Sequence, residues 1–428
     1  MADHITVYEF DALTSGAVSA PVFAWLQSRA LRLSEAGEQA WLRLTQKNGQ
    51  PAVQVTSFAG VIRAPNGFQI EVLPKVGRAM GDGDAPRARQ LLLDMLRCLR
   101  GFQHLQIDSA RLATARTPLW EVFIGEFLRA VERVVKRGLR GAYNTRQDNI
   151  VALRGKLHMA GHLRHNLCRR DRFFAEFDEF SVNRPANRLL HSALRRVLDW
   201  THLQAHQQLA RELRFVFAEV PQSQQPALDF QRVRLERDMG HYEGALAWAR
   251  LILLGDSPLT GAGSHKAPSL LFPMEKVFEA FVARHLPRQL KPPYSLQPQV
   301  SSCSLVQHEG ENWFRLRPDL LVREGSENRL VLDTKWKTLD KNKDNYGLSQ
   351  ADFYQLHAYG HNYLGGQGDV ALIYPKTDSF KEPLPVFTFP KSQGLRLWVL
   401  PFCLESKRLL LPKDGSECGL LKVFRAKP

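Results

Sequence analysis

The first eighty positions of the chain alternate apolar and polar residues in short segments. These segments are interrupted by Gly, Pro and Asn, and Pro65-Asn66-Gly67 is typical of a hairpin turn. The pattern predicts a β-rich N-terminal domain over residues 1–86. Its expected strands are Ala40–Thr45, Ala52–Phe58, Gly60–Arg63 and Phe68–Leu73.

From about residue 87 the apolar residues recur at helical spacing, with Arg or Glu on the opposite face. A stretch rich in Gly, Ser and Pro at residues 255–267 is typical of a linker. We therefore expect a mainly helical middle domain over residues 87–265. Its expected helices are Arg87–Arg100, Pro118–Arg137, Asn187–Ala205 and Glu243–Leu254.

A polar, basic segment at residues 137–172 separates the helices of this middle domain. The whole chain has a formal net charge of +15, which favours a polyanionic partner because Lys and Arg displace counterions from phosphates. The segment either lines a nucleic-acid or partner interface or is a solvated loop, and we favour the interface. The candidate DNA- or partner-binding residues are Arg137, Arg140, Arg146, Arg154, Lys156, Arg169 and Arg170.

Helical and strand patterns alternate after the linker. A helix is expected at Pro273–His285, and a later helix carries Gln355 and Tyr359 on one face because they are four residues apart. This order predicts an α/β mixed sheet over residues 266–428, so the whole chain is expected to be an α+β multidomain protein. The strands of this sheet are expected near residues 296–306, 312–322, 329–337, 369–374 and 395–400.

Two acids and a lysine stand near the ends of two neighbouring strands of that sheet. Asp319 precedes Asp333 by fourteen residues with a polar turn between them, so antiparallel pairing would bring them together. Asp333 and Lys335 are two residues apart and therefore share a face. A divalent ion held by two carboxylates and the Thr334 carbonyl would suit phosphodiester hydrolysis, with Lys335 orienting or deprotonating the water. The competing interpretation is an ordinary ion pair on a strand.

Several motifs in combination resemble a known group of enzymes. RPD at 317–319, DTK at 333–335 and QLHAY at 355–359 resemble the PD-(D/E)xK nuclease superfamily, in the variant with a QxxxY helix. More closely, the chain is similar to the McrC family, the nuclease subunits of McrBC modification-dependent restriction systems. This similarity covers most of the chain and also rests on IEVLPKVG, LRGKL, FDEFSVNRPANRLL, MEKVFEAFV and ALIYPK.

The resemblance implies roles for individual residues. Gln355 and Tyr359 would support the site near the substrate strand, and Glu279 is favoured over Glu275 as an additional metal ligand. The expected cofactor is Mg²⁺, with Mn²⁺ as the alternative because both accept an all-oxygen shell. The expected catalytic residues are Asp319, Asp333, Lys335, Gln355 and Tyr359, and the expected metal ligands are Asp319, Asp333, Thr334 and Glu279.

The resemblance also implies partners. They are double-stranded DNA and a McrB-like AAA+ GTPase that forms a hexameric ring, which such subunits enter and stimulate. Recognition of methylcytosine would belong largely to that GTPase. The sequence contains no GxxxxGK[ST] motif, so we expect no nucleotide bound through a P-loop of its own.

The expected function is therefore that of a metal-dependent DNA endonuclease subunit in a GTP-dependent, 5-methylcytosine-directed restriction complex. Two alternatives stay open: a free-standing nuclease of DNA repair or recombination, and a catalytically inactive scaffold that binds DNA or a partner. No apolar run is long enough to cross a bilayer, and the first residues lack a signal-peptide pattern. A cytoplasmic location without a membrane partner is expected.

Overall fold

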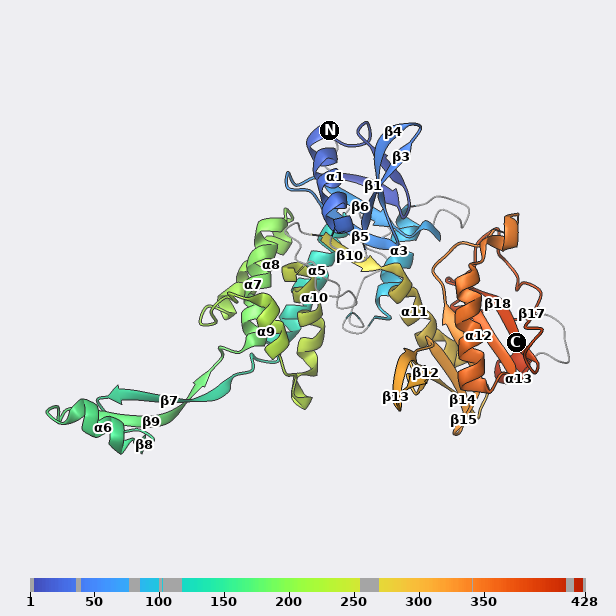
Figure 1. The fold of residues 1–428 in the computed structure, drawn as a ribbon. Helices are drawn as coiled ribbons and strands as arrows, with labels where there is room; N and C mark the ends of the chain where they lie inside the picture. Colours follow the sequence, from blue (N-terminus) through green and yellow to red (C-terminus); the bar gives the residue numbers. More distant parts are fainter. Residues whose placement is uncertain are drawn as a thin grey trace. The chain divides into compact units, whose positions relative to one another are not determined.

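The computed structural model describes residues 4–35, 40–76, 85–99, 102, 118–254, 269–340, 342–412 and 419–425. These residues form two compact units (Figure 1). One unit combines the N-terminal residues up to Leu119 with the C-terminal residues from Ser269 onward, and the other spans Trp120–Leu254. The combination of helices with several sheets agrees with an α+β protein of more than one domain. Within the described residues, no helix is both long and apolar enough to span a bilayer.

Two small sheets form the N-terminal part of the first unit. The four predicted strands are confirmed with small shifts of their ends, and β1 and β2 are added to them. The four-stranded sheet has the order β1 (His4–Tyr8), β6 (Gln69–Leu73), β5 (Phe58–Arg63) and β10 (Ser269–Pro273). The three-stranded sheet has the order β2 (Ala12–Thr14), β4 (Gln50–Val55) and β3 (Leu42–Lys47).

Strand β10 joins the N-terminal sheet although it comes from the C-terminal part of the chain. It pairs antiparallel with β5, placing Leu271 opposite Gly60. Gly60 has a φ of 138°, and a Cβ at this position would lie 2.0 Å from the Leu270 carbonyl oxygen. Only glycine allows this close approach. Residues 269–273, assigned by the sequence to the C-terminal segment, therefore complete the N-terminal sheet.

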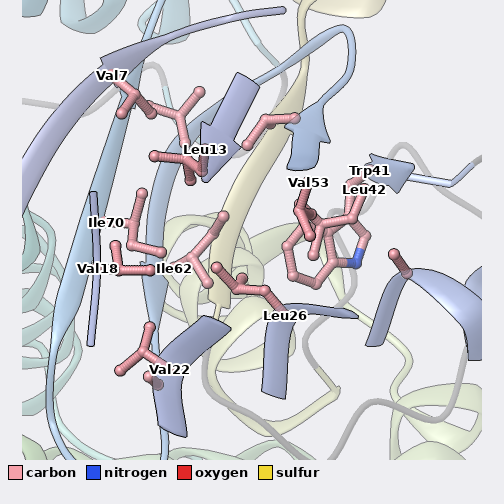
Figure 2. Close-up of a cluster of buried hydrophobic side chains, with 14 of the residues drawn as sticks. Val7, Leu13, Val18, Val22, Leu26, Trp41, Leu42, Val53, Ile62 and Ile70 are labelled. Carbon is pink, nitrogen blue, oxygen red and sulfur yellow. The ribbon is translucent and has the colours of Figure 1, made fainter. Parts of the chain in front are cut away.

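A helix that the β-rich prediction did not include covers these sheets. Helix α1 spans Ala20–Glu35 and buries one apolar face, which includes Val22 and Leu26. These side chains pack with Val53, Ile62 and Ile70 in a single apolar core (Figure 2). The burial of such side chains is the main source of stability for this part of the unit. Helix α3, at Ala85–Leu96, confirms the described part of the helix predicted at residues 87–100.

A larger mixed sheet forms the C-terminal part of the same unit. Its three central strands are parallel neighbours, and the remaining pairs are antiparallel. The order is β11 (Tyr294–Pro298), β14 (Leu320–Glu324), β15 (Glu327–Thr334), β16 (Gly368–Pro375), β18 (Leu395–Cys403) and β17 (Phe387–Thr388), with β19 (Arg408–Leu409) also paired to β18. The predicted mixed sheet is therefore present.

Two helices cover opposite faces of this sheet. Helix α12 (Gln350–Leu364) packs on the face that carries Val331 and Val399. Helix α11 (Met274–His285) packs Phe278 and Phe281 against Phe402. Since successive side chains of a strand alternate between faces, Val399 and Phe402 lie on opposite sides of β18. The central strands are thus buried on both faces, as their continuous apolar runs require.

Two of the predicted strands are each divided. The strand expected near 296–306 becomes β11 and β12 (Cys303–His308), and the strand expected near 312–322 becomes β13 (Glu311–Leu316) and β14. Strands β12 and β13 form a separate hairpin. The remaining short elements are η2 (Leu286–Gln289), η3 (Asp344–Gly347) and α13 (Gly419–Val423).

The second unit is built mainly of helices. The predicted helix at residues 187–205 ends at Trp200, and a separate helix begins at Gln204. Aromatic pairs such as Phe123 with Trp248 join the helices, with ring centroids 5.5 Å apart. The helices are α5 (Leu119–Lys136), α7 (Pro185–Trp200), α8 (Gln204–Val216), α9 (Pro226–Arg232), η1 (Arg237–Tyr242) and α10 (Glu243–Leu254).

The basic segment of this unit is an ordered arm, defined here as residues 142–181 (Figure 1). Strands β7 (Ala142–Ile150) and β9 (Phe173–Ser181) form a nine-residue antiparallel ladder. β8 (Lys156–Leu157) pairs with β9, and helix α6 (Met159–Asn166) lies between them in sequence. The segment therefore contains paired strands and a helix and is not a loop throughout, while most of its side chains are exposed. Its role as a DNA or partner interface stays a prediction.

Candidate functional site

Asp319 lies immediately before β14, and Thr334 at the end of β15 holds its carboxylate. The Thr334 amide donates to Oδ2 of Asp319 at 2.7 Å, and the Thr334 hydroxyl donates to the same oxygen at 2.6 Å. These bonds join two adjacent strand ends. The sequence predicted only that the Thr334 carbonyl binds a metal. The Thr334 amide and hydroxyl also hold the Asp319 carboxylate in position.

Asp333 is a buried carboxylate close to Asp319. Its side chain is 2% exposed and lies on the α12 face of the sheet. Burial, and after it the negative charge of Asp319, raise the pKa of Asp333 to about 7 against the lowering effect of Lys335. Although the Lys335 ammonium lies 2.6 Å from Asp333 Oδ2, no hydrogen bond of suitable geometry reaches this oxygen from the described residues. The site therefore contains a desolvated acid whose charge partner is the Lys335 ammonium.

Lys335 follows β15 directly and points to the same side as Asp333. Its ammonium donates a hydrogen bond to Oε1 of Gln355 at 3.0 Å and lies 3.7 Å from Oδ1 of Asp352. Burial by itself lowers the pKa of Lys335, but the attraction of Asp333 and the other acids raises it above its usual range. The lysine is therefore protonated in this arrangement.

Gln355 and Tyr359 connect Lys335 with the segment that precedes Asp319. Nε2 of Gln355 donates to the Tyr359 hydroxyl at 2.8 Å, and this hydroxyl donates to the Arg317 carbonyl oxygen at 3.0 Å. Both side chains lie on one face of α12, as the spacing predicted. The structure thus brings Asp319, Asp333 and Lys335 together, and the helix links the lysine to the RPD segment.

The Tyr359 hydroxyl is expected to stabilise this arrangement measurably. Tyr359→Phe leaves a ring that is 4% exposed in place and removes the only hydroxyl between Gln355 and the Arg317 carbonyl in the described structure. Because the partly buried Gln355 amide and Arg317 carbonyl would lose a partner, we expect the free energy of unfolding to fall by about 1–3 kcal/mol. Urea unfolding measures it, with Tyr354→Phe, at a side chain 67% exposed, as the control. Equal losses in both variants would contradict a specific role for Tyr359.

Asp352 belongs to the same cluster and was not among the predicted site residues. Asp352 is 7% exposed, and its carboxylate accepts a hydrogen bond from Lys337 at 3.1 Å in addition to its contact with Lys335. Asp352 lies three residues before Gln355 on α12 and therefore on the same helical face. That spacing was a signal in the sequence. Asp352 provides a second negative charge next to the ammonium of Lys335.

The two acids of α11 lie in different surroundings. Glu279 is 8% exposed and accepts hydrogen bonds from Gln299 and Lys276. The backbone amide of Gln299 donates to the backbone carbonyl oxygen of Asp319 at 2.8 Å. Gln299 therefore links Glu279 to the site. Glu275 is exposed, and its charge acts on Glu9 and Lys75. Of the two acids, Glu279 is therefore the one connected to Asp319.

The donor atoms around Asp319 suit a hard cation. In the described residues Oδ1 of Asp319 has no hydrogen-bond partner, and Oδ2 of Asp333 lacks one of good geometry. Both are carboxylate oxygens, the ligand type that Mg²⁺ prefers. Nowhere in the described residues do three or more His, Cys, Asp or Glu side chains form a cluster able to hold a metal. A bound ion would therefore rely on two acids together with backbone, water and substrate oxygens.

The predicted basic residues are distributed along the arm and at its base rather than in one cluster. Arg140 pairs with Asp238 at 2.6 Å, and Arg146 lies 2.9 Å from Asp148. The guanidinium of Arg154 lies 3.8 Å above the ring of Phe177. Among the described residues, no acid lies within ion-pair distance of the remaining four, which are exposed: Arg137, Lys156, Arg169 and Arg170.

Solved structures with a similar fold come from McrBC complexes. A chain from the refined half-complex of the tetradecameric assembly of Thermococcus gammatolerans McrB AAA+ hexamers with bound McrC is similar, with a TM-score of 0.66 and 20% identity over 96% of this chain and 97% of that chain. A chain of the Thermococcus gammatolerans McrBC complex has a TM-score of 0.51 and 20% identity, covering 66% of this chain and 87% of that chain.

At this identity the two structures show a shared fold. No match was found among curated proteins. The profile of the family described as McrBC 5-methylcytosine restriction system component matches residues 53–375, three quarters of the sequence and all of the site from Glu279 to Tyr359. The chain therefore belongs to the McrBC 5-methylcytosine restriction system component family.

Proposed function

We propose that this chain is the DNA endonuclease subunit of its restriction system and that its C-terminal sheet is a PD-(D/E)xK nuclease fold. The observation that carries the proposal is the grouping of Asp319, Asp333 and Lys335 at the ends of adjacent strands. Family membership supports the same assignment. Asp333, a buried acid with a raised pKa next to a specific charge partner, has the features of a functional-site residue.

The proposed cofactor is Mg²⁺, with Mn²⁺ as an alternative, held by Asp319, Asp333 and the Thr334 carbonyl. Such an ion, when bound, polarises the phosphoryl oxygen and lowers the pKa of the attacking water. Glu279, through Gln299, supports the position of Asp319 and is proposed as an outer member of the metal shell. Two carboxylates that share a desolvated volume repel each other, and this repulsion favours cation binding there.

The protonated Lys335 is proposed to stabilise charge on the phosphate and orient the attacking water. Its ammonium is kept in place by Asp333 on one side and Gln355 on the other. Preorganised positive charge in a partly buried site acts more strongly than in water. Gln355 and Tyr359 serve as positioning residues because they contact Lys335 and the RPD segment rather than the reacting atoms.

The tip of the arm is proposed as the surface that binds an AAA+ GTPase ring of the McrB type. Met159, Leu163 and Leu167 recur every four residues and are 58%, 56% and 77% exposed. Arg169 and Arg170 lie beside this apolar stripe in sequence. An exposed apolar surface with charged residues at its rim suits a protein partner better than a DNA backbone. One of the similar structures contains McrB AAA+ hexamers with bound McrC, which supports a partner of this kind.

The complete proposal is a GTP-dependent nuclease that acts on 5-methylcytosine-containing double-stranded DNA in the cytoplasm. The test is DNA cleavage with Mg²⁺ on methylated and unmethylated duplexes, with and without a McrB-type GTPase and GTP. We expect cutting only when partner, GTP and methylated DNA are all present. Cutting by the chain alone would favour a free-standing nuclease, and no cutting under any condition would favour a scaffold.

The double substitution Leu163→Ser with Leu167→Ser at the tip of the arm should abolish stimulation of the partner GTPase and leave helix content unchanged.

A further inference from the structure

Trp336 lies between Lys335 and Lys337 and points to the opposite side of the chain. Lys335 and Lys337 both contact Asp352 on helix α12. The Trp336 indole instead packs against Phe278 of α11, with ring centroids 5.4 Å apart, and is 2% exposed. This alternation is that of an extended segment. The position of the Trp336 ring therefore determines where the backbone of its two lysine neighbours lies.

The polar end of the Trp336 side chain is held by the N-terminal part of the same unit. Its Nε1 donates to both carboxylate oxygens of Glu9, each at 3.0 Å. Glu9 follows β1, is 3% exposed and also accepts a hydrogen bond from the Lys75 amide at 3.0 Å. The Lys75 ammonium donates to the Trp336 carbonyl oxygen at 3.1 Å. Glu9 and Lys75 thus hold both the side chain and the backbone of Trp336.

A second connection joins the N-terminal sheet to the other half of the site. Strand β10 completes that sheet and continues directly into helix α11, whose first amide, of Met274, donates to the Ser57 carbonyl oxygen at 2.9 Å. Helix α11 carries Glu279, which accepts from Gln299, and the Gln299 amide donates to the Asp319 carbonyl oxygen. The N-terminal sheet is therefore connected to Asp319 as well as to Lys335.

We propose that Glu9 and Lys75 are positioning residues for the nuclease reaction, which act on Lys335 by fixing Trp336. This proposal rests on the proposed function. The contacts are buried and specific, so they define one position of the 335–337 segment rather than a range. Small displacements of a catalytic group have large effects on rate. The N-terminal sheet is thus more than a separate structural part, because it supports the position of Lys335.

The test compares two buried glutamates of the same sheet in the full chain with its GTPase partner. Glu9→Gln places an amide where the carboxylate accepts from Trp336 and Lys75. Glu71→Gln is the matched control, since Glu71 is 4% exposed and is bonded to Arg89 and Thr6, away from Trp336. We expect Glu9→Gln to lower kcat by about 10- to 100-fold with KM unchanged. Glu71→Gln should affect thermal stability but not kcat.

A double-mutant cycle separates positioning from a general loss of stability. If Glu9 acts through Trp336, the combined variant Glu9→Gln with Trp336→Phe should lose no more kcat than the stronger single variant. Independent, additive losses would overturn the proposal. Equal kcat in Glu9→Gln and Glu71→Gln, measured where both are folded, would overturn it as well.

A measurement without DNA keeps this proposal distinct from the proposed function. Reductive methylation of the full chain, followed by mass spectrometry, reports the accessibility of Lys335, whose side chain is 18% exposed, relative to Lys276, which is 48% exposed. We expect Glu9→Gln to increase the labelling of Lys335 and Glu71→Gln to leave it unchanged. Lack of cleavage by the wild-type complex would count against the nuclease function. Unchanged Lys335 labelling in Glu9→Gln would overturn the positioning role in either case.

Discussion

Asp333→Asn is expected to lower the rate of DNA cleavage by about 10³-fold or more while the chain stays folded and bound to its partner. The substitution keeps the shape of a side chain that is 2% exposed and removes one of two carboxylates available to a divalent ion. Loss of that ion's stabilisation of the transition state costs several kcal/mol, and each 1.4 kcal/mol corresponds to about tenfold in rate. Single-turnover cleavage of a methylated duplex with Mg²⁺ measures the loss. Cleavage within about tenfold of the wild type would contradict the assignment.

The same substitution is expected to remove a loss of stability that the wild type undergoes as the pH rises from about 4 to about 7. Burial raises the pKa of Asp333 from its ordinary value of 3.8 to about 7, so the folded state favours the protonated acid. The stability that this provides is present below pH about 4 and is lost as the pH rises to about 7. The neutral amide that Asp333→Asn introduces does not titrate, so the variant does not undergo this loss.

Urea unfolding of both proteins from pH 4 to pH 8, with a chelator present, tests this expectation. The free energy of unfolding of Asp333→Asn minus that of the wild type should increase across the interval. Glu9, whose pKa burial also raises to about 7, is present in both proteins, so the difference isolates Asp333. A difference that decreases with pH would mean that the folded state favours ionised Asp333, contrary to the observed surroundings.

Lys335→Met is expected to reduce cleavage by about 10²- to 10³-fold with little change in DNA affinity. The apolar side chain retains most of the volume and removes the ammonium that lies 2.6 Å from Asp333 and 3.0 Å from Gln355. Lys337→Met is the matched control, because Lys337 also pairs with Asp352 but has no contact with Asp333 in the described structure. The control should retain near wild-type rates. Equal losses in the two variants would assign the effect to Asp352 pairing or net charge, not to Lys335.

The periodicity of the sequence determined most individual elements. Strands β5, β6, β16 and β18 and helices α5 and α10 appear close to the expected positions, because burial of one face requires a repeat that is visible locally. Helix α1 was missed although its apolar residues have helical spacing. The predicted strands near 296–306 and 312–322 are divided because residues of a separate hairpin continue the same strand-like composition.

The basic segment illustrates a limit of local pattern. Its residues are mostly exposed, so no buried face imposes a repeat, and the composition alone resembled a loop. Its order comes from the ladder between β7 and β9, whose partners are about thirty residues apart. Such pairing is a property of the folded chain and leaves a weak signal in sequence.

The residues of the candidate site likewise fall into two groups, those identified from the sequence and those that only the folded structure brings together. The sequence by itself determined the residues whose chemistry depends on short spacing: Asp333 with Lys335, and Gln355 with Tyr359. Only the tertiary structure brought Asp319 to Thr334, added Asp352, and placed Glu9 and Lys75 against Trp336. The contact between Glu9 and Trp336 joins residues 327 positions apart. Neighbours at such separation are selected by packing of buried surfaces and pairing of desolvated polar groups, which no local repeat in one sequence records.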